Sequence, residues 1–529
     1  MKDIKKYLII GATTKQYFLA AEHIQKKYKV EPVLWTAPTR YISQISDKFK
    51  STIALDHFLF VRGNIEKISE LIDADIDDLT MPLTREWQES YSSERLKILE
   101  DLLHRTDPGG NYQLSEITET INNYFMIANA VIGKFKPELI IFPDAPHLPF
   151  DLTLYYISKR KGIEISFITN IIPYVGFTGD SITGPHNFFN LNIKNKFGEV
   201  KKNELFENNL QSIGKGIPTY MRAGKSYLAV DKYARTFPSM ICDIAISALS
   251  SLKWYVINKI NQLGLFQLPK NVERYAKIKN KDLWKTSGSS YFIFRHVVIN
   301  VILEIYYNFQ SKSFSNDFKK HGNKYLYIPL SMQKERTTMP CAGNMYDQSL
   351  YIKQLINFLP EDWTIVIKEN PKQFRHNTGI PARNLRFYKK LIHSGVLFAP
   401  LDYSSNKLIS ASSAVCVTTG TSGFESIVGF SKPVLAFADS WYSSLPGIIS
   451  IHNINDIKKA FELIATDKIV FNNDEIRNAI DKLISQSFLL TFGPVPEGQV
   501  YDDISLNLAN IWSSHLNLFE NSSKFNETN

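Results

Sequence analysis

A stretch rich in hydroxyl groups and glycine, TTGTSGFES, occupies residues 418–426 between an apolar run and a helical pattern. The N-terminus of a helix carries unpaired backbone N–H groups and a partial positive charge, so it attracts anions. The glycines Gly420 and Gly423 would let the backbone approach a ligand closely. We therefore expect a phosphate cradle here, with Glu425 accepting hydrogen bonds from ribose hydroxyls. The expected phosphate-binding residues are Thr419, Gly420, Thr421 and Ser422.

An ordinary capped helix accounts for the same stretch, because Thr and Ser side chains often bind the first N–H groups of a helix. Neighbouring loops favour the phosphate cradle. Lys368, Asn370 and Pro371 end another apolar run, and Arg336 supplies a guanidinium that suits phosphate or carboxylate. The alternative for Arg336 is a surface ion pair. Three further arginines are each expected to be solvated helix residues: Arg375, Arg383 and Arg386.

A carboxylate and an imidazole follow an apolar run in the first part of the chain. The sequence FPDAPHLPFD at 142–151 places Asp144 directly after that run and His147 three residues later. Either could act as a general base toward an acceptor hydroxyl. The alternatives are that Asp144 caps the loop or the next helix, and that His147 is structural. The loop GATTK at 11–15 is expected to face the cleft into which Asp144 and His147 would point, where it could contact the acceptor.

Composition indicates a soluble, cytoplasmic protein. The chain has 529 residues, 44% hydrophobic and 21% charged, with a net charge of +9. This length suffices for two or three domains. The three cysteines lie far apart and the histidines are isolated, so we expect neither disulfides nor a metal site. The sequence shows no secretion signal, no membrane-length apolar run and no element that reads nucleic acid.

Apolar strand-length runs alternate with helical patterns twice along the chain, which predicts two parallel sheets covered on both faces. The first set includes HFLFV at 57–61, taken as its third strand, and KPELIIFPD at 136–144. Because ligands bind outside the C-terminal ends of such strands, the polar loops should converge there. We expect an acceptor domain at 1–224, a helical insertion at 225–322, a donor domain at 323–515 and a polar tail at 516–529.

The expected insertion contains an apolar helix from residue 290, preceded by the basic run KNVERYAKIKNKDLWK at 270–285. A solvated helix face explains that run. The functional alternative is a site for anionic lipid head groups or an anionic glycan. It would allow peripheral contact with the inner face of an anionic membrane.

The two alternating units, with TGTSGFES and GFSKPVLAF in the second, resemble a GT-B glycosyltransferase. More narrowly, KENP at 368–371 followed by a hydroxyl-rich strand end resembles bacterial capsule and surface-polysaccharide enzymes that use CMP-activated acidic sugars. These are sialyltransferase-like and Kdo-transferase-like proteins, in which a His-Pro pair faces the CMP phosphate. Here Asn370 stands where the histidine is expected. Its side-chain amide can donate a hydrogen bond but cannot donate a proton. The resemblance covers residues 325–437 well and the N-terminal half only in architecture.

The resemblance implies an α/β fold of two Rossmann-like, doubly wound domains that face a cleft. It also implies metal-independent, inverting transfer of an ulosonic acid (pseudaminic, legionaminic, sialic acid or Kdo) to a surface polysaccharide. The CMP-sugar donor would be a co-substrate with no further cofactor, and the acceptor a glycan or lipid-linked glycan. Three alternatives stay open: a transferase that uses a UDP or GDP sugar, a sugar-nucleotide epimerase, and a non-catalytic glycan-binding or assembly protein.

Overall fold

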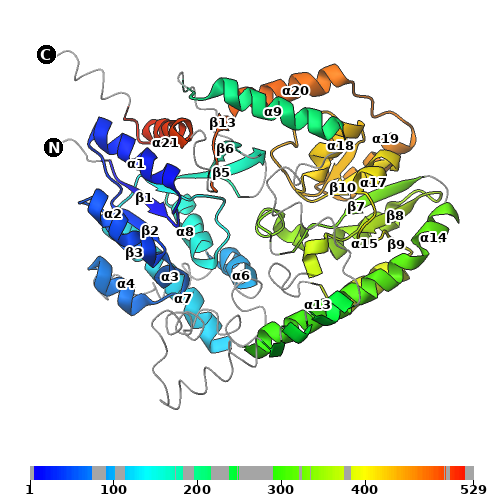
Figure 1. The fold of residues 1–529 in the computed structure, drawn as a ribbon, viewed down its shortest axis with the longest axis horizontal. Helices are drawn as coiled ribbons and strands as arrows, with labels where there is room; N and C mark the ends of the chain where they lie inside the picture. Colours follow the sequence, from blue (N-terminus) through cyan, green and yellow to red (C-terminus); the bar gives the residue numbers. More distant parts are fainter. Residues whose placement is uncertain are drawn as a thin grey trace.

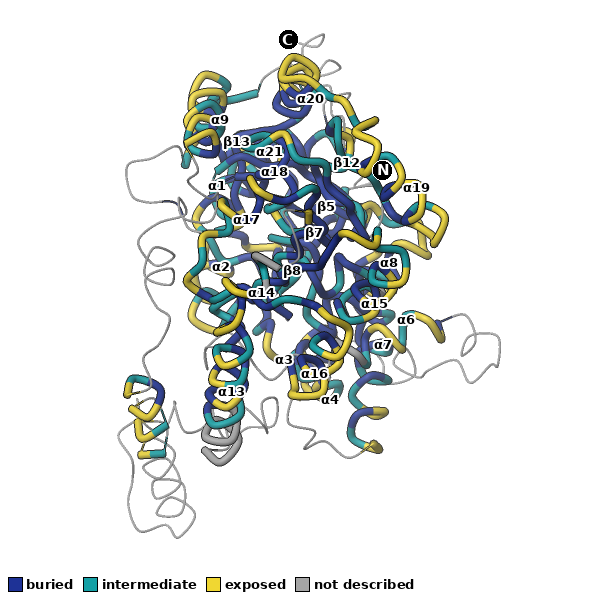
Figure 2. The backbone as a smooth tube through the Cα atoms, turned by 90° about the vertical axis from the view of Figure 1, so that its right-hand side faces the viewer, coloured by how far each residue is buried: buried dark blue, intermediate teal, exposed yellow. Residues whose placement is uncertain are grey.

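The chain forms two α/β domains, each built on its own sheet (Figure 1). The computed structural model describes residues 5–73, 91–101, 114–182 except 173, 193, 196–215, 238–249 except 243 and 247, 290–320, 324–374 except 334, 383–495 except 494, and 501–518. Figure 2 shows the strands buried in the interior and the exposed residues on the outer helices. The expected fold class, two doubly wound domains, is confirmed.

The N-terminal sheet has seven strands in the order β13-β6-β5-β4-β1-β2-β3. Strands β1 to β5 pair in parallel, whereas β6 and β13 add an antiparallel edge. The strand YLII is buried at every position, as a sheet covered on both faces requires. The strands are β1 (Tyr7–Ile10), β2 (Leu34–Ala37), β3 (Ile53–Asp56), β4 (Leu139–Ile141), β5 (Glu164–Ile172), β6 (Val175–Gly179) and β13 (Phe488–Leu489).

Helices cover both faces of this sheet (Figure 1). The helices are α1 (Lys15–Tyr28), α2 (Ile42–Lys48), α3 (His57–Val61), α4 (Ile65–Ile72), α6 (Ser92–Asp101), α7 (Leu114–Phe135), α8 (Pro149–Arg160), α9 (Glu199–Gly214) and α21 (Tyr501–His515). Helices α1 to α8 connect successive parallel strands, as crossover connections must. Helix α9 follows the antiparallel strand β6 and also packs against α18 (Ser422–Phe430) of the other domain, and α21 follows β13.

The strand expected at 57–61 is wrong, because these residues form helix α3 and strand β3 ends just before them. Asp56 caps the helix: its carboxylate accepts a hydrogen bond from the Phe58 N–H at 3.0 Å. A five-residue apolar run is too short for its periodicity to separate helix from strand. The aspartate before it was the helix signal that the sequence offered.

The C-terminal sheet has six strands in the order β12-β11-β10-β7-β8-β9, all parallel. Its C-terminal edge collects the loops that were expected to bind an anion. The strands are β7 (Tyr325–Pro329), β8 (Thr364–Lys368), β9 (Leu397–Phe398), β10 (Ala414–Val417), β11 (Val434–Ala436) and β12 (Ile448–Ser450). The helices are α14 (Phe314–Lys320), α15 (Gln348–Phe358), α16 (Leu385–His393), α17 (Ser405–Ala411), α18 (Ser422–Phe430), α19 (Ile454–Ala465) and α20 (Asn473–Gln486).

Each sheet separates two hydrophobic clusters. In β1, Leu8 and Ile10 join the cluster on one face, whereas Tyr7 and Ile9 join the cluster on the other. Strand β7 alternates in the same way. This alternation follows from the two-residue period of a strand, and it gives each domain a core on both sides of its sheet.

The chain returns to the N-terminal domain near its C-terminal end. Strand β13 pairs with β6, and helix α21 packs against α1 (Figure 1). The Trp512 ring is fully buried, with its centre 5.9 Å from that of the Tyr17 ring. Gln16 also donates a hydrogen bond to the Thr491 carbonyl at 3.1 Å. The last part of the expected 323–515 domain therefore belongs to the N-terminal domain.

Helix α13 (Ser290–Gln310) matches the apolar helix expected from residue 290. Its buried Tyr307 donates a hydrogen bond to the Ala399 carbonyl at 2.7 Å, which fastens the helix to the C-terminal domain. Its outer face exposes Ile302, Ile305 and Phe309. Within the described residues, no helix combines the length and hydrophobicity needed to cross a bilayer. The basic run at 270–285 lies outside them.

Candidate functional site

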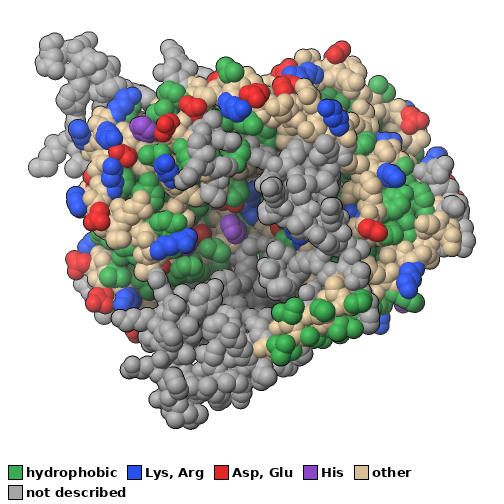
Figure 3. Space-filling view, viewed as in Figure 1, with side chains coloured by type: hydrophobic (Ala, Val, Ile, Leu, Met, Phe, Trp, Pro, Cys, Tyr) green, Lys and Arg blue, Asp and Glu red, His purple; other side chains and the backbone are tan. Residues whose placement is uncertain are grey.

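A pocket of about 290 Å³ opens at the C-terminal edge of the second sheet. The loops after β7, β8 and β10 form it, together with helix α17 and the first turn of α18. Figure 3 shows a histidine and basic side chains in the region where the two domains meet. Seven of the predicted binding residues line this pocket: Lys368, Asn370, Pro371, Gly420, Thr421, Ser422 and Glu425.

The first turn of α18 supports the phosphate cradle more than plain capping. Thr421 stands at the N-cap position, yet its side chain makes no capping hydrogen bond. Thr421 and Ser422 both line the pocket. Capping therefore does not account for the Thr421 hydroxyl.

Thr419 does not line the pocket with the other three. Its hydroxyl donates a hydrogen bond to the Thr337 carbonyl and is largely buried. This bond ties the loop after β10 to the loop that carries Arg336. Thr419 thus shapes the pocket by fixing two loops to each other.

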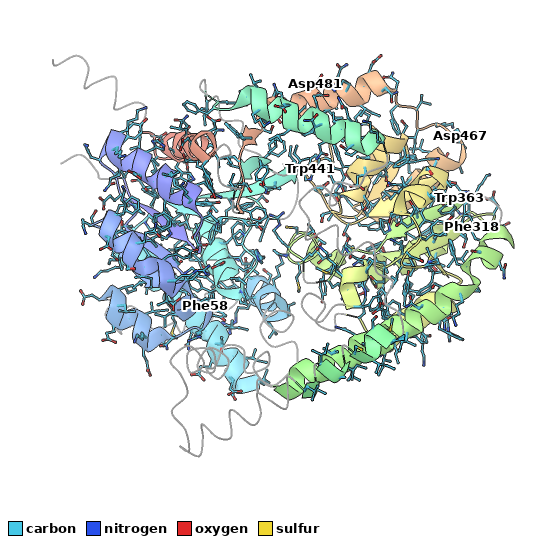
Figure 4. All side chains as sticks on the ribbon, viewed as in Figure 1. Phe58, Phe318, Trp363, Trp441, Asp467 and Asp481 are labelled. Carbon is cyan, nitrogen blue, oxygen red and sulfur yellow. The ribbon has the colours of Figure 1, made fainter. Side chains whose placement is uncertain are left out.

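Gly423 faces an aromatic side chain, and not the pocket as expected. A Cβ atom at this position would lie 2.7 Å from the Tyr442 hydroxyl oxygen. Tyr442 is fully buried, and its hydroxyl donates to the Gly420 carbonyl. Its neighbour Trp441, on the side of the domain that faces the first domain, packs on Phe424 of α18 (Figure 4). These rings hold the N-terminus of α18 in place.

Replacing Gly423 with alanine is therefore expected to lower the free energy of unfolding by about 1–3 kcal/mol, because the new methyl group overpacks against Tyr442. Urea unfolding of the two proteins measures the difference. Gly133→Ala is the matched control, since a Cβ there meets nothing within 4 Å. That control should keep or slightly raise stability. Equal effects at both positions would contradict the packing argument.

The loop after β8 is fixed by local hydrogen bonds. Asn370 begins a short 3-10 turn: its side-chain oxygen accepts from the Lys372 N–H at 3.0 Å. Pro371 follows as the first residue of that turn. Lys368 extends into the pocket and donates to the Ser405 hydroxyl at 3.2 Å. The side-chain amide of Asn370 is thus held by its own loop and lines the pocket beside a lysine.

Arg383 is buried, so its expected place on a solvated face is wrong. Its Nε donates to Glu369 Oε1 at 2.7 Å, and both side chains are at most 1% exposed. Tyr388 donates to the same oxygen at 2.9 Å, and Arg383 reaches the Ser331 carbonyl at 3.2 Å. The network thus joins the ends of β7 and β8 under the pocket. Arg386 is exposed, and Arg375 lies outside the described residues.

Asp144 and Arg336, which come from different domains, form an ion pair with each other. Arg336 Nη1 donates to Asp144 Oδ1, and that oxygen also accepts from the Ala145 N–H at 2.8 Å. The guanidinium lies 6.0 Å from the centre of the Phe492 ring, in the segment that returns to the N-terminal domain. The expected base and the expected anion-binding arginine are thus brought together, and in this structure each is the ion-pair partner of the other.

His147 lies in the same loop as Asp144. Its Nδ1 is 2.8 Å from the Ala145 carbonyl oxygen, which only accepts, so Nδ1 carries a proton. In the neutral ring Nε2 is then the nitrogen that takes up a proton. The geometry is compatible with the role of base that the sequence suggested, without assigning it.

Several further groups line the pocket that the sequence did not single out. Glu335 lines it beside Thr337, whose hydroxyl donates to Glu335 Oε2 at 3.3 Å. Burial raises the pKa of the Glu335 carboxyl, against the opposing effects of Lys372 and Thr337. Lys372 and Ser405 also line the pocket. The only signal in the sequence was their position just after strands, which many loop residues share.

A second cavity, of about 870 Å³, lies in the N-terminal domain at the N-terminus of α1. The predicted loop 11–15 contributes Thr13, Thr14 and Lys15, and the ammonium of Lys15 lies 4.9 Å from the centre of the Tyr501 ring. Aromatic and polar side chains share the walls. The other lining residues are Phe18, Leu19, Glu22, Tyr41, Ser43, Gln44, Asp47 and Lys48.

Comparison with known proteins adds no argument about the site or the fold. Within the described residues, no three His, Cys, Asp or Glu side chains are grouped so as to hold a metal ion. No family model and no curated protein matches the chain. Solved structures match it over most of its length, but at low identity and with low TM-scores.

UDP-GlcNAc 2-epimerase from Methanocaldococcus jannaschii is 11% identical, over 91% of this chain and 99% of that one, with a TM-score of 0.24. A trehalose-6-phosphate synthase is 8% identical over 97% and 99%, with a TM-score of 0.26. A glycosyltransferase from Rickettsia africae ESF-5 is 9% identical over 98% and 99%, with a TM-score of 0.24. TM-scores this low carry no inference about function, and the two-domain fold rests on the sheet topology.

Proposed function

We propose that the protein is a glycosyltransferase that moves a sugar from a nucleotide donor to a glycan acceptor. The pocket at the C-terminal edge of the second sheet carries the proposal. In it, the N-terminus of α18 and the hydroxyls of Thr421 and Ser422 meet Lys368 and Lys372. Helix N-termini, hydroxyls and ammonium groups are the groups that bind phosphate in proteins.

The donor that fits the pocket and the sequence resemblance best is a CMP-activated ulosonic acid. The nucleotide phosphate would bind at Thr421 and Ser422, with Asn370 beside it. Lys368 would offset the charge of the phosphate or of the sugar carboxylate, and Glu425 would accept from ribose hydroxyls. The cavity volume, about 290 Å³, lies just below the usual range for small-ligand sites and suits the nucleoside monophosphate part of the donor.

The acceptor, a glycan or lipid-linked glycan of a surface polysaccharide, would bind to the N-terminal domain. The cavity at the N-terminus of α1 supports this, because its walls combine Phe18, Tyr41 and Tyr501 with hydroxyl and amide groups. Aromatic rings offer apolar faces, and the polar groups would bind sugar hydroxyls. Asp144 would take the proton of the attacking hydroxyl in an inverting, metal-independent transfer.

The test is thermal unfolding of the purified full chain with CMP, UDP, GDP and CDP side by side, because a ligand that binds only the folded state raises the unfolding temperature. Selective stabilisation by CMP supports the ulosonic-acid donor. Selective stabilisation by UDP or GDP keeps a nucleotide-sugar enzyme and discards that donor. Product analysis with the matching donor then separates transfer from epimerisation. Binding of no nucleotide would favour a glycan-binding protein instead.

Replacing Thr421 and Ser422 together with alanine is expected to weaken nucleotide binding by about 1–3 kcal/mol, because hydrogen bonds to a charged phosphate are lost. Isothermal titration with the best nucleotide measures this change. Ser410→Ala is the control: Ser410 lies on the exposed end of α17 and does not line the pocket. Undiminished affinity in the double variant would remove these hydroxyls from the phosphate site.

A further inference from the structure

The pocket contains three glutamates, and their surroundings differ. Glu369 is held by Arg383 and Tyr388 under the pocket, so its carboxylate is committed to a structural network. Glu425 is buried in the first turn of α18. Glu335 is half-buried on the loop after β7, on the pocket wall. Of the three, Glu335 is the carboxyl on the pocket wall that lies neither in the Arg383 network nor at the positive end of a helix, which favours a charged carboxylate.

The backbone holds Glu335 firmly in this position. Its carbonyl accepts hydrogen bonds from the N–H groups of Thr338 and Met339 at 3.0 and 2.9 Å. The Thr338 hydroxyl donates to the same carbonyl at 2.8 Å. Three bonds to one carbonyl fix the turn, and the Thr337 hydroxyl steadies the carboxyl group at its end. Such a fixed position is what a group that acts on a bound ligand needs.

The chemistry of the proposed transfer asks for an acid at this place. When the bond between the anomeric carbon and the phosphate oxygen breaks, its electron pair stays on that oxygen. The amide of Asn370 cannot supply a proton, and Lys368 and Lys372 supply positive charge. Burial keeps the pKa of Glu335 raised, so its carboxyl stays protonated to a higher pH than an exposed glutamate.

We propose that Glu335 is the general acid of this site, which rests on the proposed function. The carboxyl O–H gives its proton to the phosphate oxygen as the bond between that oxygen and the anomeric carbon breaks, and the acceptor oxygen forms the new bond to the anomeric carbon. The proton of the acceptor hydroxyl goes to the base on the N-terminal domain, and solvent reprotonates Glu335 after the nucleotide leaves. Lys372 is the charged group that acts on the Glu335 carboxyl. Lys368, Glu425 and Glu369, which is paired with Arg383, line the same pocket, and the adjacent Arg336 is paired with Asp144.

The test compares the wild type with Glu335→Gln and Glu335→Asp, using the nucleotide sugar that wild-type protein turns over. Loss of general acid catalysis is expected to lower kcat of E335Q by roughly 10²–10⁴-fold. Nucleotide affinity should stay within a few fold, and E335D should recover part of the rate. The wild-type rate should fall as pH rises through the pKa of Glu335, because the acid form is lost. E335Q should lack this alkaline fall.

Two outcomes would overturn the acid role while leaving the proposed function intact. One is E335Q with wild-type kcat. The other is a fold-decrease in the rate of E335Q that equals its fold-decrease in nucleotide affinity, which would make Glu335 a binding group. Failure of the proposed function looks different, since wild-type protein would then transfer no sugar from any nucleotide donor, whether or not it binds nucleotide. That result would overturn the acid role as well. Nucleotide affinity of E335Q close to that of the wild type also shows that the variant is folded.

Discussion

Replacing Arg383 with methionine is expected to lower the free energy of unfolding by about 3–5 kcal/mol, because it leaves a buried carboxylate without its partner. Glu369 and Arg383 are almost fully buried, and their ion pair spans 2.7 Å. Glu369 Oε2 and Arg383 Nη1 have no hydrogen-bond partner among the described residues. Few other bonds would therefore stabilise the carboxylate once the arginine is removed. Urea unfolding measures the loss.

Two variants make this result specific. Arg386→Met changes an exposed arginine of the helix that follows, and stability should stay within about 0.5 kcal/mol. Arg383→Met combined with Glu369→Leu removes both charges, and it should be more stable than the single variant because no charge is left unpaired. A single variant as stable as the wild type, or a double variant less stable than the single one, would contradict the buried-pair argument.

Asp144→Asn is expected to lower the transfer rate by roughly 10²–10⁴-fold, since an amide cannot accept the proton of the acceptor hydroxyl. Nucleotide affinity should not fall. The ion pair between Asp144 and Arg336 would weaken, and the freed guanidinium could only add to the attraction for an anion. Steady-state kinetics with the nucleotide sugar, together with nucleotide titration, measure the two effects separately.

The control for this variant is the other candidate base, which lies three residues further along the same loop. His147→Gln keeps a polar side chain and removes the imidazole. It should retain most of the transfer rate if Asp144 is the base. A large loss of rate in this variant, with wild-type turnover in Asp144→Asn, would assign the base to His147. Asp144 would then serve only to hold Arg336 across the two domains.

The sequence predicted the alternation of strands and helices, and with it the edge at which the pocket forms. Asn370, Lys368 and the first turn of α18 could be found because parallel strands deliver their loops to one edge. Arg383 could not, because its burial depends on Glu369, which lies 14 residues away beyond a loop. Gly423 was assigned to a ligand because nothing in the sequence placed Tyr442 against it. Long-range packing decided each of these.

The pairing of Asp144 with Arg336 also lay beyond the sequence, since the two residues are separated by 192 positions and belong to different domains. Each was recognised singly as a polar group after a strand. How two domains face each other depends on contacts that local patterns do not encode. The same holds for Glu335, whose raised pKa comes from burial and is invisible in a list of residue types.

The return of the chain to its first domain has a consequence for synthesis. On the ribosome, N-terminal domains generally fold first, but here β6 lacks its partner β13, and α1 lacks α21, until residues 488–515 have been made. Until then the apolar surface around Tyr17 that Trp512 covers stays open. The first domain to be translated is therefore the last to be completed, and a nascent chain stalled after residue 487 should attract chaperones.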